Sequence, residues 1–245
     1  MLNDYPLKAV LWDFDGTLAD TLQRNLSVNR RIVEEVTGRS WHDVAGLSSV
    51  EAYVAAWNRV SNWQELYTRA FGLSKEQCAE AAQRWAPYQL DDQTRVPLFD
   101  GIGAVLEKLR GFPQAIVSQN ERAIIAQILS ADKADHFFTA IVGFAEVPVD
   151  RQKPAPDGLL SALDILGVEE PACALFIGDH ETDIICVTNA NRDLTAMGRD
   201  LRIVSVAAHY MSSGDSPKWS VAPDYHIYHP EELGQLVDQV CVEDK

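Results

Sequence analysis

Short apolar segments alternate with helical segments through most of this 245-residue chain. The segment at residues 9–12 is continuously apolar, which is typical of a parallel strand covered on both faces. Further strands are predicted at 114–117, 138–142, 174–177, 203–207 and 225–227, and helices at 101–110, 121–129, 158–166 and 231–240. Strands separated by helices form a parallel sheet with helices on both faces. We therefore expect an α/β protein with a Rossmann-like three-layer core.

A helical insert interrupts this alternation between residues 20 and 93, where no segment has the pattern of a strand. Helices are predicted there at 21–36, 50–60, 63–71 and 75–88. An insert of this kind loops out of the α/β core as a separate unit. We predict a core formed by residues 1–18 and 96–245, and a small all-α helical-bundle cap domain formed by residues 19–95.

Local signals refine these helices. Ser74 and Gln77 have the spacing of a capping box. Asp100 and Asn120 are expected to cap the helices that follow them. Five of the six tryptophans lie in the insert, near it or in the first strand, and we expect them to fill the core of the helical bundle: Trp12, Trp41, Trp57, Trp63 and Trp85.

Composition limits the partners of the chain. Its formal charge is −15, from 21 basic and 36 acidic residues, and it has no polybasic run, which argues against nucleic acid or an anionic membrane as partner. No stretch approaches the roughly 20 apolar residues of a membrane span, and the N-terminus lacks the features of a signal peptide. The four cysteines are scattered without a CxxC pair, so a reducing cytoplasm is expected. A small anionic substrate remains compatible with these features.

Two aspartates follow the first predicted strand, Asp13 and Asp15 in the segment Asp13-Phe14-Asp15-Gly16. Two carboxylates this close disfavour each other's ionisation, and buried charges need a partner or a metal. A hard divalent cation with oxygen ligands is the simplest compensation. One carboxylate can then attack phosphorus while the other transfers protons.

Other polar residues follow the later predicted strands. They are Ser118 after 114–117, Asp179 and Asp183 after 174–177, and Lys153 in a proline-flanked loop before a helix. Taken singly, each has an ordinary explanation as a turn residue, a helix cap or an exposed lysine. In an open parallel sheet, however, ligands bind beyond the carboxyl ends of the strands. Together these residues predict one site with a nucleophile pair, a hydroxyl group, a fixed cation and metal ligands.

These segments resemble the motifs of the haloacid dehalogenase-like hydrolases, in the phosphoglycolate phosphatase-like branch whose helical cap follows the first motif. The matching segments are Asp13-Phe14-Asp15-Gly16-Thr17-Leu18-Ala19-Asp20, Ser118, Lys153-Pro154-Ala155-Pro156 and Gly178-Asp179-His180-Glu181-Thr182-Asp183. Their order and spacing fit the family over the whole chain, strongly in the core and weakly in the cap.

The resemblance implies a Mg²⁺-dependent phosphohydrolase that cleaves a small, phosphoglycolate-like phosphate monoester through an aspartyl-phosphate. Asp13 is implied as the nucleophile and Asp15 as the general acid and base, with Ser118 and Lys153 as further catalytic residues. The implied phosphate-binding residues are Gly16, Thr17, Ser118, Gln119 and Lys153. The implied metal ligands are Asp13, Asp15 through its backbone carbonyl, Asp179 and Asp183, the last acting from outside the inner set.

Alternatives remain open at the level of sequence. A phosphotransferase of the β-phosphoglucomutase type shares all four motifs, and a catalytically silent phosphate-binding protein is also compatible with them. The resemblance implies that Asp15 favours phosphate esters, because the dehalogenases lack this second aspartate. The partner is expected to be a small phosphorylated metabolite, and the chain a monomer or homodimer.

Three departures from the family pattern stand out. Gln119 intervenes between Ser118 and Asn120, and His180 takes the place of a smaller residue. The helix of the fourth motif is expected to end at Ala190-Asn191, with Asn191 as a left-handed cap. The following segment, 192–201, is then longer than usual.

Overall fold

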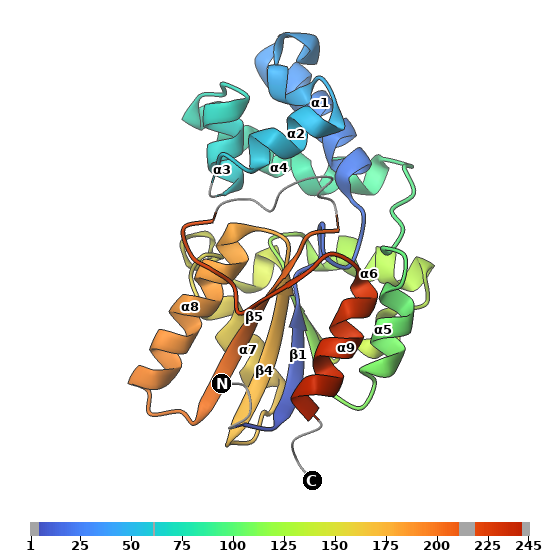
Figure 1. Ribbon diagram of the computed structural model, residues 1–245. Coiled ribbons are helices and arrows are strands. Elements are labelled where there is room, and N and C mark those ends of the chain that lie inside the picture. The colour runs from blue at the N-terminus through green and yellow to red at the C-terminus, as the bar shows by residue number, and fades with distance from the viewer. Residues whose placement is uncertain (1–4, 61, 211–218, 242–245) are drawn as a thin grey trace. The chain divides into compact units, whose positions relative to one another are not determined.

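The computed structural model describes residues 5–60, 62–210 and 219–241 (Figure 1). The chain divides into two compact units, an α/β unit formed by Met1–Asp20 with Pro97–Lys245 and a helical unit formed by Thr21–Val96. Each helix in the described part of the chain is too short or too polar to cross a membrane.

The α/β unit is built on a parallel sheet with the strand order β3-β2-β1-β4-β5-β6. The described strands are β1 (Leu7–Trp12), β2 (Gln114–Val117), β3 (Ala140–Val142), β4 (Ala172–Gly178), β5 (Leu201–Ala208) and β6 (Tyr225–Ile227). Every residue of β2 and β4 is buried, which explains why these strands are almost continuously apolar rather than alternating; the polar exception is Gln114. The predicted three-layer α/β architecture is confirmed.

Helices cover both faces of this sheet (Figure 1). On one face lie α7 (Asp157–Leu166) and α8 (Glu181–Ala196), and on the other α5 (Ile102–Lys108), α6 (Arg122–Ala131) and α9 (Pro230–Cys241). Side chains of β1 and β4 pack with those of α7 and α8 into a core that includes Leu11, Phe176, Leu159 and Val187. This core fixes the position of the strand ends.

The strand ends place polar residues at one edge of the sheet. Trp12, the last residue of β1, pairs with Ile116 of β2 and with Ile177 of β4. Because the strands are parallel, the residues that follow these pairs emerge at the same carboxyl edge. Asp13, Ser118 and Asp179 therefore reach that edge together.

The helical unit has its own apolar core. Its helices are α1 (Leu22–Thr37), α2 (Val50–Trp57), α3 (Trp63–Glu65), which continues as a π-helix (Leu66–Ala70), and α4 (Lys75–Asp91), with short 3₁₀ turns at Trp41–Asp43 and Ala45–Leu47. The predicted capping box is confirmed, because Ser74 N donates to Gln77 Oε1 at 2.9 Å and Gln77 N donates to Ser74 Oγ at 3.2 Å.

The expectation that tryptophans fill this core is confirmed only in part. Trp41, Trp57, Trp63 and Trp85 are only half-buried and pack around a core of smaller residues that includes Ile32, Leu47, Tyr53 and Phe71. An indole is large, so part of its ring can cover the apolar core while another part stays exposed. The fifth, Trp12, is buried in β1, where its Nε1 donates to Gln114 Oε1 at 2.9 Å.

Three predicted helix caps are also corrected. Gly101, with a positive φ of 89°, precedes α5, and Glu121 precedes α6, so neither Asp100 nor Asn120 is the N-cap. The helix α8 does not end at Asn191 but continues to Ala196. Asn191 instead exchanges two hydrogen bonds with the backbone of Ile203 in β5, at 2.7 and 2.8 Å.

Candidate active site

Asp13 stands at the carboxyl end of β1 with its backbone held by the sheet. Its N–H donates to the carbonyl of Ile177 at 2.8 Å, and the residue is 6% exposed. The chain then turns sharply, with Gly16 at a φ of +78°, and the Gly16 N–H donates to the Ala19 carbonyl at 3.0 Å. Phe14 is fully buried and its carbonyl accepts from Leu18 N at 3.0 Å, so the loop after Asp13 is anchored on the core.

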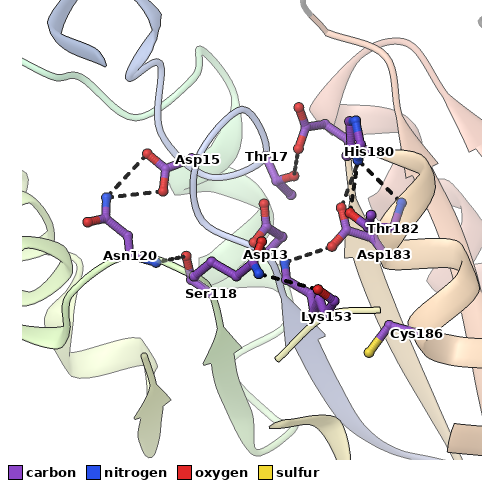
Figure 2. A network of polar contacts seen from close by, with 12 residues as sticks. Asp13, Asp15, Thr17, Ser118, Asn120, Lys153, His180, Thr182, Asp183 and Cys186 are labelled. Carbon is purple, nitrogen blue, oxygen red and sulfur yellow. Dashed lines mark hydrogen bonds and ion pairs between the residues drawn. The ribbon is translucent and has the colours of Figure 1, made fainter. Parts of the chain in front are cut away.

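Lys153 brings a positive charge to this carboxylate (Figure 2). Its Nζ lies 2.5 Å from Asp13 Oδ1 and 2.7 Å from Asp183 Oδ1, and the residue is 8% exposed. The loop that carries it is fixed from both sides, by Asn189 Nδ2 donating to the Pro154 carbonyl at 2.9 Å and by Gln152 Nε2 donating to the Phe144 carbonyl at 3.0 Å. Lys153 is thus a buried cation rather than a solvated surface lysine.

Three carboxylates converge beside this lysine. Oxygens of Asp13, Asp179 and Asp183 all lie within 4.8 Å of one another. Asp183 is held in the first turn of α8, where its Oδ2 accepts from His180 N at 3.1 Å. The Thr17 hydroxyl, which is fully buried, points at Asp179 Oδ1 at 3.4 Å.

Burial and the neighbouring carboxylates both disfavour ionisation of Asp13 and Asp179. Burial raises the pKa of Asp13 to about 7, although Lys153 opposes this rise. Burial, together with Asp13 and Asp183, raises the pKa of Asp179 well above its usual range. Burial alone would lower the pKa of Lys153, but the two carboxylates that it contacts outweigh burial and raise it. A set of oxygen donors that repel one another fits a hard divalent cation.

Asp15 lies apart from the cluster and points toward Asn120 (Figure 2). The Asn120 amide nitrogen is 3.1 Å from Asp15 Oδ2 and 3.3 Å from Oδ1. The backbone N–H of Asn120 donates to Ser118 Oγ at 3.1 Å, so Asn120 hydrogen-bonds both Ser118 and Asp15. Sequence reasoning missed this contact because it treated Asn120 only as a helix cap.

The structure brings the predicted site residues together at one edge of the sheet. Several of the predicted phosphate-binding groups make hydrogen bonds within the protein. Gln119 Nε2 donates to the Lys153 carbonyl at 3.3 Å, Thr17 contacts Asp179, and the Gly16 N–H is used in its own turn. Contacts of Gly16, Thr17 and Gln119 with a phosphate stay predictions. The same holds for the backbone carbonyl of Asp15 as a metal ligand.

This combination of fold and site defines a class of protein. A sequence model of the haloacid dehalogenase-like hydrolases matches residues 10–197, and the chain belongs to that family. The predicted family and enzyme class, a phosphatase of the haloacid dehalogenase-like type, agree with this match and with the relatives described next.

The curated relatives include several phosphoglycolate phosphatases. Phosphoglycolate phosphatase 1 of Pseudomonas aeruginosa is 25% identical over 192 residues, which span 75% of this chain and 66% of that protein. The phosphoglycolate phosphatase of Aquifex aeolicus is 25% identical over 97% of this chain and 100% of its own length. The N-acetylmuramic acid 6-phosphate phosphatase of Pseudomonas putida is 26% identical over 95% of this chain and 96% of its own. The match with the first of these covers slightly less than two thirds of its length.

Solved structures share the fold. A haloacid dehalogenase-like family hydrolase of Streptococcus pneumoniae superposes with a TM-score of 0.69 at 20% identity, covering 97% of this chain and 100% of that chain. A subfamily IA hydrolase of the same superfamily from Geobacter sulfurreducens gives a TM-score of 0.61 at 22% identity, covering 96% and 98%. At these identities the likeness shows the fold alone.

Proposed function

We propose that the protein is a Mg²⁺-dependent phosphatase that hydrolyses a small phosphate monoester through an aspartyl-phosphate on Asp13. The observation that carries this proposal is the buried contact of 2.5 Å between Lys153 Nζ and Asp13 Oδ1 at the carboxyl end of β1. A carboxylate fixed beside a permanent cation can accept the approach of an anionic phosphoryl group, which a carboxylate alone would repel.

The first step forms a bond between an Asp13 oxygen and phosphorus while the ester P–O bond breaks. Asp15 gives its proton to the departing alcohol oxygen. In the second step, Asp15 takes a proton from water as the water oxygen attacks phosphorus, which releases inorganic phosphate and regenerates Asp13. Two carboxylates with separate surroundings, Lys153 for Asp13 and Asn120 for Asp15, support this division of roles.

Asp13, Asp179 and Asp183 would hold the metal, because their oxygens are the only such cluster found in the described part of the chain. A divalent cation bound there would offset the negative charge that nucleophile and substrate share. The residues of the chain do the remaining work. Lys153 fixes the nucleophile Asp13, and Ser118, with 7% of its surface exposed, presents its hydroxyl at the same edge.

The choice of substrate is part of the proposal, and the relatives support it. Phosphoglycolate phosphatases recur among the curated relatives, so a phosphoglycolate-like ester is the first candidate. The relatives also include an N-acetylmuramic acid 6-phosphate phosphatase, which adds sugar phosphates to the test set. We assign the helical unit the role of a cap that sets the choice among them.

The test is phosphate release from a panel of small phosphate esters, with and without Mg²⁺. We expect release that depends on the metal, is abolished by EDTA and is lost in Asp13→Asn. Phosphorus NMR of the products distinguishes hydrolysis from transfer, since a mutase yields an isomerised sugar phosphate rather than free phosphate. Full release by Asp13→Asn, or release that is indifferent to EDTA, contradicts the proposal.

A further inference from the structure

We infer that Asn120 is a positioning residue for the acid–base group Asp15, so that its side-chain amide controls proton transfer to the leaving group. This inference rests on the proposed function, and it assigns to Asn120 a role in the reaction that the sequence analysis did not predict. Asn120 is 3% exposed and lies two residues before the start of α6, at the same edge of the sheet as Asp13.

The contact is made to both oxygens of the carboxylate. Asn120 Nδ2 lies 3.1 Å from Asp15 Oδ2 and 3.3 Å from Asp15 Oδ1, across 105 residues of sequence (Figure 2). An amide nitrogen placed between two carboxylate oxygens restricts rotation of the carboxylate about its last bond. A general acid acts only when it is within hydrogen-bond reach of the atom that it protonates, so this restriction bears directly on its efficiency.

Asn120 is itself held at every other polar group. Its backbone N–H donates to Ser118 Oγ at 3.1 Å, its backbone carbonyl accepts from Phe144 N at 2.8 Å, and its Oδ1 accepts from Glu121 N at 2.8 Å. The Nδ2 group is therefore aimed at Asp15 by a side chain that has little freedom to turn. A residue whose backbone makes two hydrogen bonds and whose side chain makes a third is the kind of rigid support that holds a reacting group in a productive geometry.

Close packing behind Asn120 adds to this rigidity. A Cβ atom added at Gly143 would lie 2.9 Å from the Asn120 carbonyl oxygen, so the chain after β3 can approach Asn120 only because residue 143 is glycine. Gly143 N in turn donates to Glu146 Oε2 at 2.9 Å. The support therefore extends from Asp15 through Asn120 to the end of β3.

The inference predicts a loss that depends on the leaving group. Protonation matters for an alkyl phosphate, whose alkoxide is a poor leaving group, and matters little for 2,4-dinitrophenyl phosphate. We expect Asn120→Ala to lower kcat/KM for the alkyl ester by about 10- to 100-fold, less than the roughly 10²–10⁴-fold of general acid catalysis because Asp15 itself remains, and for the aryl ester by less than about 3-fold. Asn120→Asp keeps an acceptor for Glu121 N but removes the donor to Asp15, and it should show the same selectivity.

Two controls separate positioning from a merely structural effect. Gln119→Ala changes the neighbouring residue, whose amide contacts the Lys153 carbonyl, and should alter both esters by the same factor. In an Asp15→Ala background, the added Asn120→Ala change should cause no further loss on the alkyl ester, because residues that act as a unit are non-additive.

Selective loss on the alkyl ester with no further loss in the double variant supports the role of Asn120. Equal losses on both esters, or an additive loss in the double variant, overturn it while leaving the phosphatase intact. Absence of metal-dependent release by the wild-type protein overturns the proposed function, and the role of Asn120 with it.

Discussion

Lys153 is the single residue on which the charge balance of the site depends most. It is buried between Asp13 and Asp183, and its removal leaves two buried carboxylates without their cation. We expect Lys153→Met to lower the free energy of unfolding by about 3–5 kcal/mol in metal-free buffer, as for other broken buried pairs. Chemical denaturation measures this change.

Lys108→Met is the matched control for that experiment. Lys108 also bonds a carboxylate, Asp238, at 2.5 Å, but its side chain is 42% exposed. A solvent-exposed pair contributes about 0–1 kcal/mol, so this substitution should be nearly neutral. If both substitutions lower the free energy of unfolding by the same amount, the account of Lys153 as a cation needed by buried carboxylates is contradicted.

His209, at the end of β5, gives a prediction about pH. Burial, with a contribution from His226, lowers the pKa of His209 below its ordinary 6.5. A histidine whose pKa is lowered in the folded state stabilises the fold above its unfolded pKa, and that stability is lost as pH falls. The free energy of unfolding should therefore decline as the pH is lowered below about 6.5.

The substitution His209→Phe tests whether His209 causes this pH dependence of the free energy of unfolding. The ring of His209 stacks on those of His226 and Tyr228, with centroids 5.2 Å apart in both pairs, and a phenyl ring can keep that packing. Denaturation curves at pH 7.5 and pH 5 should differ less in the variant than in the wild-type protein. Parallel declines in the two proteins would mean that other groups cause the acid sensitivity.

At the scale of elements, the junction between β4 and α8 determines the geometry of the metal cluster. A Cβ atom at Gly178 would lie 2.5 Å from Asp183 Oδ2, so the helix can bring Asp183 this close only beside a glycine. We expect Gly178→Ala to displace Asp183 and weaken Mg²⁺ affinity by about 10- to 100-fold, as changes around ligands do. Mg²⁺ titration followed by thermal shift measures the affinity.

Gly103→Ala is the control for Gly178→Ala, because it makes the same substitution at a site without a close neighbour. A Cβ there meets nothing within 4 Å, and the residue lies inside α5. Alanine is favoured over glycine in a helix by up to about 1 kcal/mol, and Gly103 lies in the first turn, so this variant should be as stable as the wild-type protein or slightly more stable, with unchanged Mg²⁺ affinity. Loss of affinity in both variants would contradict the role of the β4–α8 junction.

Sequence patterns predict the strands and their common edge because buried parallel strands are apolar and end at the same side of a sheet. They predict less well what a polar residue near a helix end does. Asn120 and Asn191 have the sequence properties of caps, yet their amides bond Asp15 and the backbone of Ile203. A local cap and a contact made across many residues require the same side chain, so sequence alone does not separate them.

At the scale of the whole molecule, each unit has its own apolar core. A substitution that destabilises the helical unit should therefore leave metal binding by the α/β unit unchanged. Phe71 is 2% exposed in the helical unit and packs edge-on against Tyr67 at 5.6 Å between ring centroids. We expect Phe71→Ala to destabilise that unit by about 3–5 kcal/mol and to leave Mg²⁺ affinity unchanged. Differential scanning calorimetry with and without Mg²⁺ measures both effects.

Phe176→Ala is the counterpart in the α/β unit. Phe176 is fully buried in β4, and Lys153 Nζ lies 5.7 Å from the centre of its ring. This variant should lose a similar amount of stability and, unlike Phe71→Ala, should also bind Mg²⁺ more weakly. If both variants affect Mg²⁺ binding alike, the two units are not independent in this sense.

The central claim is that Asp13 carries the phosphoryl group during turnover. Acid quenching of the Mg²⁺-bound enzyme within its first turnover, followed by peptide mass spectrometry, tests it most directly. The claim predicts a phosphoryl adduct on the peptide that contains Asp13, at higher occupancy in Asp15→Ala than in the wild-type protein. Rapid phosphate release with no adduct in either protein, or an adduct on another residue, would contradict it.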